Sequence, residues 1–236
     1  MRIDKFISEL GVASRKDASR IAKGGGVLVD GEPVRDLSRH IDPNVNKVVF
    51  QGRELSYEKY VYVMLNKPLG YVSATEDSSL PVVTELLPEE LRKRGLFPVG
   101  RLDKDTVGLM ILTNNGKLAH SLLSPKHHVE KEYYFESAEP VISGAEALFL
   151  NGVTLSDGYE CKSAELKLSD ARNSGTIVLT EGKYHQIKRM IASTSNKVTY
   201  LKRVRFANIP LDDSLAEGEW RYLSEDEANS IIALAK

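Results

Sequence analysis

The sequence predicts an α+β protein with two domains, a small N-terminal module and a larger domain rich in strands. Three observations lead to this prediction. The chain has 236 residues, 42% of them hydrophobic, which is enough for a small and a medium core. Closely spaced helices and strands are predicted within residues 2–53, and a polar stretch follows them. From residue 61 onward, short apolar runs alternate with helical segments. We place the domains at residues 1–55 and 61–236, with a linker at 56–60.

The N-terminal module begins with two predicted helices. Apolar side chains repeat at helical spacing from Phe6 to Leu10. Ser14 is a predicted N-cap for the second helix, and Asp17 at N3 gives a weaker form of the capping box. Glycines at 24–26 end that helix. Strands are predicted at residues 27–29 and 48–50, and Asp-Gly at 30–31 predicts a hairpin turn.

The second helix of this module is basic. Three of its basic side chains fall at i, i+4 and i+7 and therefore share one face. The basic residues of this helix are Arg15, Lys16, Arg20 and Lys23. Together with the segments 2–7, 14–18 and 27–34, the module resembles the S4 RNA-binding domain. The resemblance implies an αL fold whose basic helix contacts structured RNA.

The larger domain is predicted to alternate strands and helices. Predicted strands cover residues 60–65, 71–74, 109–113, 130–135, 165–168, 176–180, 198–201 and 220–223. One helix is predicted over 84–94, with Pro88 in an unfavourable interior position. Another follows Asn-Asn-Gly at 114–116, and a third bears the basic segment near residue 188. Capping boxes are predicted for two more helices, at Ser143 with Glu146 and at Ser224 with Glu227.

Charge is segregated along the chain although the net charge is only −1. Residues 183–205 contain no acid, and residues 212–227 contain a single base, Arg221. The basic side chains of the first window are Lys183, Lys188, Arg189, Lys197, Lys202, Arg203 and Arg205. Such a window is typical of phosphate binding, and a solvated face is the alternative that charge alone leaves open.

Several classes of protein are not expected. A single cysteine, Cys161, allows neither an intramolecular disulfide nor a multi-cysteine metal site. No apolar stretch is long enough for a membrane span, and the start has no apolar signal segment, so we expect a cytoplasmic protein. The sequence contains no GxxxxGK[ST], GxGxxG, GxSxG or HExxH pattern, and we expect no metal site.

The candidate catalytic stretch is Gly-Arg-Leu-Asp-Lys-Asp-Thr-Val-Gly-Leu at residues 100–109. It places two carboxylates, Asp103 and Asp105, immediately before the apolar run 110–112. This stretch and the segments 66–72 (NKPLGYV), 131–133 (KEY) and 182–190 (GKYHQIKRM) resemble, in order, the motifs of pseudouridine synthases. The resemblance is to the branch that modifies ribosomal RNA and carries an N-terminal S4 domain. It implies a mixed, mainly antiparallel sheet flanked by helices.

The resemblance also implies roles for individual residues. Asp103 would be the catalytic carboxylate, Tyr133 would stack on the target base, and Lys188 would keep Asp103 charged. Arg189 is the alternative ionic partner, and Asp105 is expected to be structural or to face RNA. The other RNA contacts implied are Lys67, Arg101, His185, Gln186 and Arg189. The reaction needs no cofactor.

The segment 184–190 is most similar to that of the enzymes that act on the small ribosomal subunit. We therefore expect 16S rRNA or a small-subunit assembly particle as the partner and a monomeric enzyme. The same reaction on 23S rRNA is the alternative. A catalytically inactive RNA-binding assembly factor is a further alternative, which the presence of Asp103, Tyr133 and Lys188 disfavours.

Overall fold

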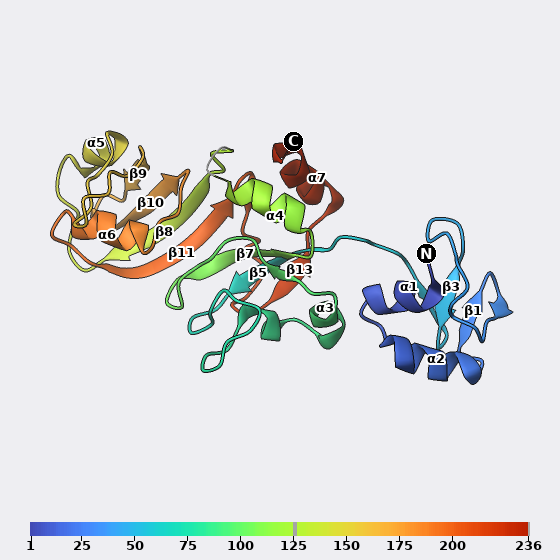
Figure 1. Cartoon of the computed structure of the whole chain (residues 1–236). Coiled ribbons are helices and arrows are strands. Elements are labelled where there is room, and N and C mark those ends of the chain that lie inside the picture. The colour runs from blue at the N-terminus through green and yellow to red at the C-terminus, as the bar shows by residue number, and fades with distance from the viewer. Residues whose placement is uncertain (125–126, 236) are drawn as a thin grey trace. The chain divides into compact units, whose positions relative to one another are not determined.

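The computed structural model describes residues 1–124 and 127–235, which form two compact units (Figure 1). One unit contains Met1–Val61 and Leu87–Leu96, and the other contains Tyr62–Leu86 and Phe97–Lys236. The segment Leu87–Leu96 is grouped with the N-terminal residues although its chain neighbours belong to the larger unit. A division of the chain by sequence order alone does not express this grouping.

The N-terminal unit packs two helices on a small sheet. The helices are α1 (Ile3–Glu9) and α2 (Arg15–Lys23). The sheet has the order β2-β1-β3-β4, with β1 (Val27–Val29), β2 (Glu32–Pro33), β3 (Val48–Phe50) and β4 (Arg53–Leu55). Its core includes Phe6, Ala18 and Val48. The predicted N-cap is confirmed, because the Ser14 hydroxyl accepts the backbone N–H of Asp17 at 3.1 Å.

The larger unit is built on one sheet with the order β13-β5-β7-β11-β8-β10-β9. β12 pairs with β11, and β6 pairs with β7. Of these pairs, only β7 with β11 is parallel, so the predicted mixed, mainly antiparallel sheet is confirmed for the described residues. The strands are β5 (Tyr62–Lys67), β6 (Phe97–Pro98), β7 (Val107–Thr113), β8 (Lys131–Ser137), β9 (Glu165–Leu168), β10 (Ser174–Leu179), β11 (Val198–Phe206), β12 (Ile209–Pro210) and β13 (Trp220–Tyr222).

Helices pack around this sheet. α4 (Gly116–Leu123) and α7 (Glu225–Leu234) lie side by side, and α5 (Ala145–Leu150) packs beside β9 (Figure 1). α6 (Gln186–Ala192) lies next to β11. A continuous core joins Met64, Leu109 and Phe206 of the sheet to Leu118 of α4 and Ile231 of α7. The strand β7, which follows the candidate catalytic stretch, is buried along its whole length.

Three local predictions were wrong. Residues 71–74 form no strand and contribute only an isolated bridge between Val72 and Val82. The helix predicted over 84–94 is split into a 3-10 turn, Val83–Leu86, and α3 (Glu89–Lys93), because Pro88 takes the N-cap position.

The third wrong prediction is the capping box at Ser143. Gly144 is the N-cap of α5, with φ 82°, and no side chain caps this helix. The Glu146 carboxylate instead binds the guanidinium of Arg172 at 3.2 Å. The other capping box is confirmed, since Ser224 and Glu227 bond reciprocally at the start of α7.

One glycine is required where the two central parallel strands meet. Gly108 has φ 97°, and a Cβ at this position would lie 2.4 Å from the carbonyl oxygen of Arg203. Only glycine allows both the backbone conformation and the close approach. The end of the candidate catalytic stretch is therefore fixed against β11.

Candidate active site

The loop that carries Asp103 lies between β6 and β7 and is held by the segment after β5. The Ser73 hydroxyl donates to the carbonyl oxygen of Leu102 at 2.8 Å and accepts the backbone N–H of Leu102 at 2.9 Å. The backbone N–H of Gly70 donates to the carbonyl of Lys104 at 2.9 Å. The residues on both sides of Asp103 are thus tied to a neighbouring segment, which limits where its carboxylate can lie.

Lys67 completes this attachment from inside the protein. Lys67 is 0% exposed. Its ammonium donates to the carbonyl oxygens of Thr106 at 2.8 Å and of Pro68 at 3.1 Å. A third contact, to the carbonyl of Lys104, measures 3.4 Å. Burial lowers the pKa of Lys67 to about 8, although Asp105 and Asp103 act in the opposite direction. This burial argues against the RNA contact predicted for Lys67 and favours a role in positioning the loop.

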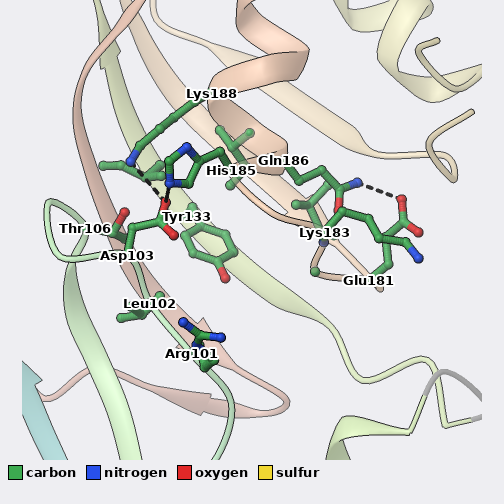
Figure 2. Close-up of a pocket in the computed structure, with 14 residues that line it drawn as sticks. Arg101, Leu102, Asp103, Thr106, Tyr133, Glu181, Lys183, His185, Gln186 and Lys188 are labelled. Atoms are coloured by element: carbon green, nitrogen blue, oxygen red, sulfur yellow. Dashed lines mark hydrogen bonds and ion pairs between the residues drawn. The ribbon is translucent and has the colours of Figure 1, made fainter. Parts of the chain in front are cut away.

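Asp103 lies within an ionic cluster, which Figure 2 shows. The Lys188 ammonium is 3.0 Å from Asp103 Oδ2 (Figure 2). The same ammonium is 2.5 Å from Asp105 Oδ1. His185 Nε2 lies 3.6 Å from the same Asp103 oxygen. The second oxygen, Oδ1, makes no hydrogen bond to another side chain or backbone group in the described part of the chain. One oxygen of the Asp103 carboxylate is therefore held by ion pairs, while the other can still bond to a substrate.

The two carboxylates differ in exposure. The side chain of Asp105 is 65% exposed, whereas those of Asp103 and Lys188 are 29% and 22% exposed. Burial acts to lower the pKa of Lys188, but the hydrogen bonds and charges of Asp105 and Asp103 outweigh it and raise that pKa. Lys188 therefore stays cationic at neutral pH, and the more protected carboxylate beside it is Asp103.

Tyr133 faces Asp103 across a small cavity of about 80 Å³. The tyrosine comes from β8, the aspartate from the loop before β7, and Lys188 from α6, so the sheet brings three distant segments together (Figure 2). Thr106 also lines the cavity, and its hydroxyl oxygen is buried with no hydrogen-bond partner in the described residues. The cavity thus combines a carboxylate, a cation, an aromatic ring and one unused hydroxyl.

The other residues predicted from the segment 182–190 make different contacts in the structure. His185 adopts a left-handed conformation with φ 49° at the start of α6, and its ring stacks on Tyr184 at 3.8 Å. Gln186 is 4% exposed and binds the carboxylate of Glu181 at 2.6 Å, which argues against the predicted RNA contact and favours support of the turn. Arg189 pairs with Asp157 at 2.6 Å, so the described partner of Asp103 is Lys188.

The remaining predicted RNA contacts are solvent-accessible. Arg101 is exposed beside Tyr133, in the loop of Asp103 (Figure 2). The four basic residues of α2 in the N-terminal unit, Arg15, Lys16, Arg20 and Lys23, are also exposed. Arg20 is bound to Asp17 at 2.8 Å. These positions are compatible with contacts to a large polyanion.

Ser73 and Glu181 belong to the site but were not predicted from the sequence. Ser73 was assigned to a strand that does not form, and its hydroxyl gave no separate signal. Glu181 lies between the predicted strand 176–180 and the segment 182–190 and belongs to neither. Its position next to the basic segment 182–190 was the one available signal for a role in that loop.

The described residues contain no group of three or more His, Cys, Asp or Glu that could hold a metal ion. Within the same part of the chain, no helix is both long and apolar enough to cross a membrane.

Comparison with known proteins identifies the class of the chain. The family described as RNA pseudouridylate synthase matches residues 61–193, and the S4 domain family matches residues 1–46. The chain therefore belongs to the RNA pseudouridylate synthases, with an S4 domain at its N-terminal end. It is an enzyme that isomerises uridine in RNA.

Individual relatives extend over almost the whole chain. An uncharacterized RNA pseudouridine synthase, YtzG, of Bacillus subtilis (strain 168) is 44% identical over 231 residues, 96% of each protein. The ribosomal small subunit pseudouridine synthase A of Escherichia coli (strain K12) is 38% identical, covering 98% of this chain and 100% of that protein. A solved pseudouridylate synthase matches with a TM-score of 0.70 and 36% identity, covering 98% of this chain and 99% of that one.

Proposed function

We propose that the protein converts one uridine of 16S rRNA to pseudouridine, with Asp103 as the catalytic carboxylate. The observation that carries the proposal is the arrangement of Asp103, Lys188 and Tyr133 around one cavity. The choice of 16S rRNA is supported by relatives named for the small ribosomal subunit at 38% identity. The substrate is either free 16S rRNA or a small-subunit assembly particle, which the enzyme would meet in the cytoplasm.

The reaction exchanges one bond to the ribose for another. As the N1–C1′ bond breaks, the Asp103 carboxylate bonds to C1′ as the nucleophile and the base leaves as its anion. The base then turns, C5 bonds to C1′, and the carboxylate is released. The proton on C5 is lost and N1 gains one, so atoms and electrons balance without an oxidant or cofactor. The unbonded Oδ1 of Asp103 is the atom available for the first step.

Lys188 and Tyr133 support this sequence in different ways. The Lys188 ammonium, 3.0 Å from Asp103 Oδ2, would stabilise the negative charge of the carboxylate released when C5 bonds to C1′. Because Lys188 supplies a compact charge rather than a planar fork, it can bind Asp103 and Asp105 together. Tyr133 is 9% exposed and presents its ring to the cavity, where it would stack on the base and assist removal of the C5 proton.

The RNA has to be opened before this chemistry is possible. A base within a duplex is inaccessible, so the target nucleotide must be extruded into the cavity. Arg101, exposed beside Tyr133, is placed to hold the backbone or to fill the position that the base leaves. The exposed basic face of α2 would bind structured RNA through its phosphates.

The proposed substrate is tested by mapping pseudouridine after incubation of the full chain with 16S and 23S transcripts and with immature subunits. Carbodiimide treatment followed by primer extension gives a stop at each pseudouridine. We expect one enzyme-dependent stop in 16S rRNA, in the transcript or in the particle. A stop found only in 23S rRNA would show that the assignment to the small subunit is wrong.

A further inference from the structure

A second, larger cavity of about 460 Å³ adjoins the catalytic cavity. Both cavities are lined by Tyr133 and Arg101 and by the turn that contains Glu181, Gly182 and Lys183. The tyrosine proposed to stack on the target base is thus a wall of both. An RNA strand whose target nucleotide enters the catalytic cavity would pass beside this larger cavity.

Two cations lie on the wall that the sheet contributes to the larger cavity. Lys131 and Tyr133 are two residues apart on β8 and therefore point to the same face. Arg203 of β11 is in register with Tyr133, so its side chain lies on that face as well. Arg203 is only 1% exposed and lines the cavity.

These cations have no carboxylate partner in the described part of the chain. The Lys131 ammonium donates to the carbonyl of Val129 at 2.8 Å. Arg203 donates through Nε to the carbonyl of Leu109 at 2.7 Å and through Nη2 to Met110 Sδ at 3.8 Å. No acid of residues 1–124 or 127–235 lies within ion-pairing distance of either side chain. Both cations lie over the ring of Phe206, at 5.8 Å for Lys131 and 5.4 Å for Arg203. Because enclosed charges are normally paired with an acid, the buried Arg203 and the half-buried Lys131 on one wall favour binding of an anion.

The acid at this cavity, Glu181, forms no ion pair with either cation in the described part of the chain. Both oxygens of Glu181 accept hydrogen bonds, one from the Tyr159 hydroxyl at 2.7 Å and the other from Gln186 at 2.6 Å. Around the same cavity stand the further cations Arg101, Lys162 and Lys183. The cavity therefore carries an excess of positive charge. Burial, with Arg203 adding to it, lowers the pKa of Lys131 to about 8, a shift that a bound anion would reverse.

We propose that this cavity binds a phosphodiester of the RNA strand next to the target uridine, held by Lys131 and Arg203. The proposal rests on the proposed function, because it needs an RNA whose nucleotide occupies the adjoining catalytic cavity. A phosphate accepts hydrogen bonds from both a lysine and an arginine, and these side chains have unused N–H donors. The subsite would fix the strand while the base turns against Tyr133.

The test combines protein variants with RNA hairpins that contain the mapped uridine. Each hairpin carries one uncharged methylphosphonate in place of a phosphate near the target, and the dissociation constant is measured at pH 7 for the full chain. For the unmodified protein, we expect one position to weaken binding about tenfold or more. Lys131→Met should weaken binding of the native hairpin to a similar extent and should then be insensitive to that methylphosphonate.

Two further variants separate charge recognition from structure. Lys131→Arg keeps the charge and should retain the response to the methylphosphonate. Lys167→Met is the matched control, because Lys167 is an exposed lysine on β9 that pairs with Glu165 and lines neither cavity. A purely structural role for Lys131 would change the thermal unfolding of Lys131→Met and leave the methylphosphonate response intact, and that result would overturn the proposal.

Other outcomes are equally decisive. Additive effects of Lys131→Met and every methylphosphonate would show that Lys131 contacts none of these phosphates. Inorganic phosphate that competes with RNA in a Lys131-dependent manner, with no methylphosphonate effect, would assign the site to a free anion and refute the backbone contact. Pseudouridine mapped only in 23S rRNA would refute the choice of 16S rRNA alone, because a hairpin taken from 23S rRNA would test the phosphate contact by binding in the same way.

Discussion

Removal of the Ser73 hydroxyl tests how the catalytic loop is positioned. Ser73→Ala keeps Cβ and deletes only the oxygen that bonds both the N–H and the carbonyl of Leu102, at 2.9 and 2.8 Å. Leu102 is 6% exposed, so water does not readily replace both bonds. Leaving these groups unsatisfied costs about 1–3 kcal/mol, and the loop can recover part of this only by moving.

The expected consequence is a loss of rate rather than of RNA affinity. Asp103 is adjacent to Leu102 in the chain, and a displacement of about 1 Å at a reacting group costs on the order of 10²-fold in rate. We therefore expect the single-turnover rate of Ser73→Ala to fall about 10- to 100-fold. The dissociation constant for RNA should change by less than about twofold, because Ser73 lines neither cavity.

The assay follows release of tritium from C5 of the target uridine with enzyme in excess, and unfolding in urea reports stability. Ser78→Ala is the matched control, since the exposed Ser78 hydroxyl bonds among the described residues only to that of Ser79, at 3.4 Å. A Ser73→Ala rate within twofold of the unmodified protein would refute the claim that this hydroxyl positions Asp103.

Three other predictions follow from the charged groups. Lys188→Met should slow the single-turnover rate about 10- to 150-fold, with Lys188→Arg less affected because it keeps the charge. Replacing Lys16 and Lys23 by Met should reduce the slope of log affinity against log salt by about two, as measured by RNA titration. Between pH 8 and 10.5 Lys67 is protonated in the unfolded chain but has lost its proton in the folded protein, so the free energy of unfolding should rise as the pH rises through this range. Relative to Lys67→Met, the unmodified protein should gain up to about 3 kcal/mol, as measured by urea unfolding at several pH values.

The sequence was informative where a pattern is local. Hydrogen bonds made within one turn determine the caps at Ser14 and Ser224, and both were predicted. The capping box predicted at Ser143 does not form, because Arg172, 26 residues away from Glu146, binds the carboxylate that a capping box requires. Local chemistry therefore predicted an element only where no distant side chain competed for it.

The candidate site shows the same limit. Asp103, Tyr133 and Lys188 were predicted from motifs, and the structure places them around one cavity. Lys67 was predicted to contact RNA, since nothing in the neighbouring sequence shows that β5 pairs with β7 and places this lysine opposite Gly108. That Lys131 has no acidic partner in the described part of the chain could not be predicted either, because this depends on which acids the fold brings within ion-pairing distance.

The proposed reaction depends on the carboxylate of Asp103. Asp105→Asn provides the comparison, because Asp105 binds the same lysine from a more exposed position and should reduce the rate about fivefold at most. Asp103→Asn and Asp105→Asn each keep the size of the side chain and remove one negative charge. A difference in rate between these two variants therefore reports the position of the carboxylate rather than the net charge.

The most direct measurement is pseudouridine formation by Asp103→Asn on the mapped RNA, together with its affinity for that RNA. We predict no detectable pseudouridine after prolonged incubation, with an unchanged dissociation constant and unfolding transition. Pseudouridine formed by Asp103→Asn at a rate comparable to that of Asp105→Asn would contradict the assignment of Asp103 as the catalytic carboxylate.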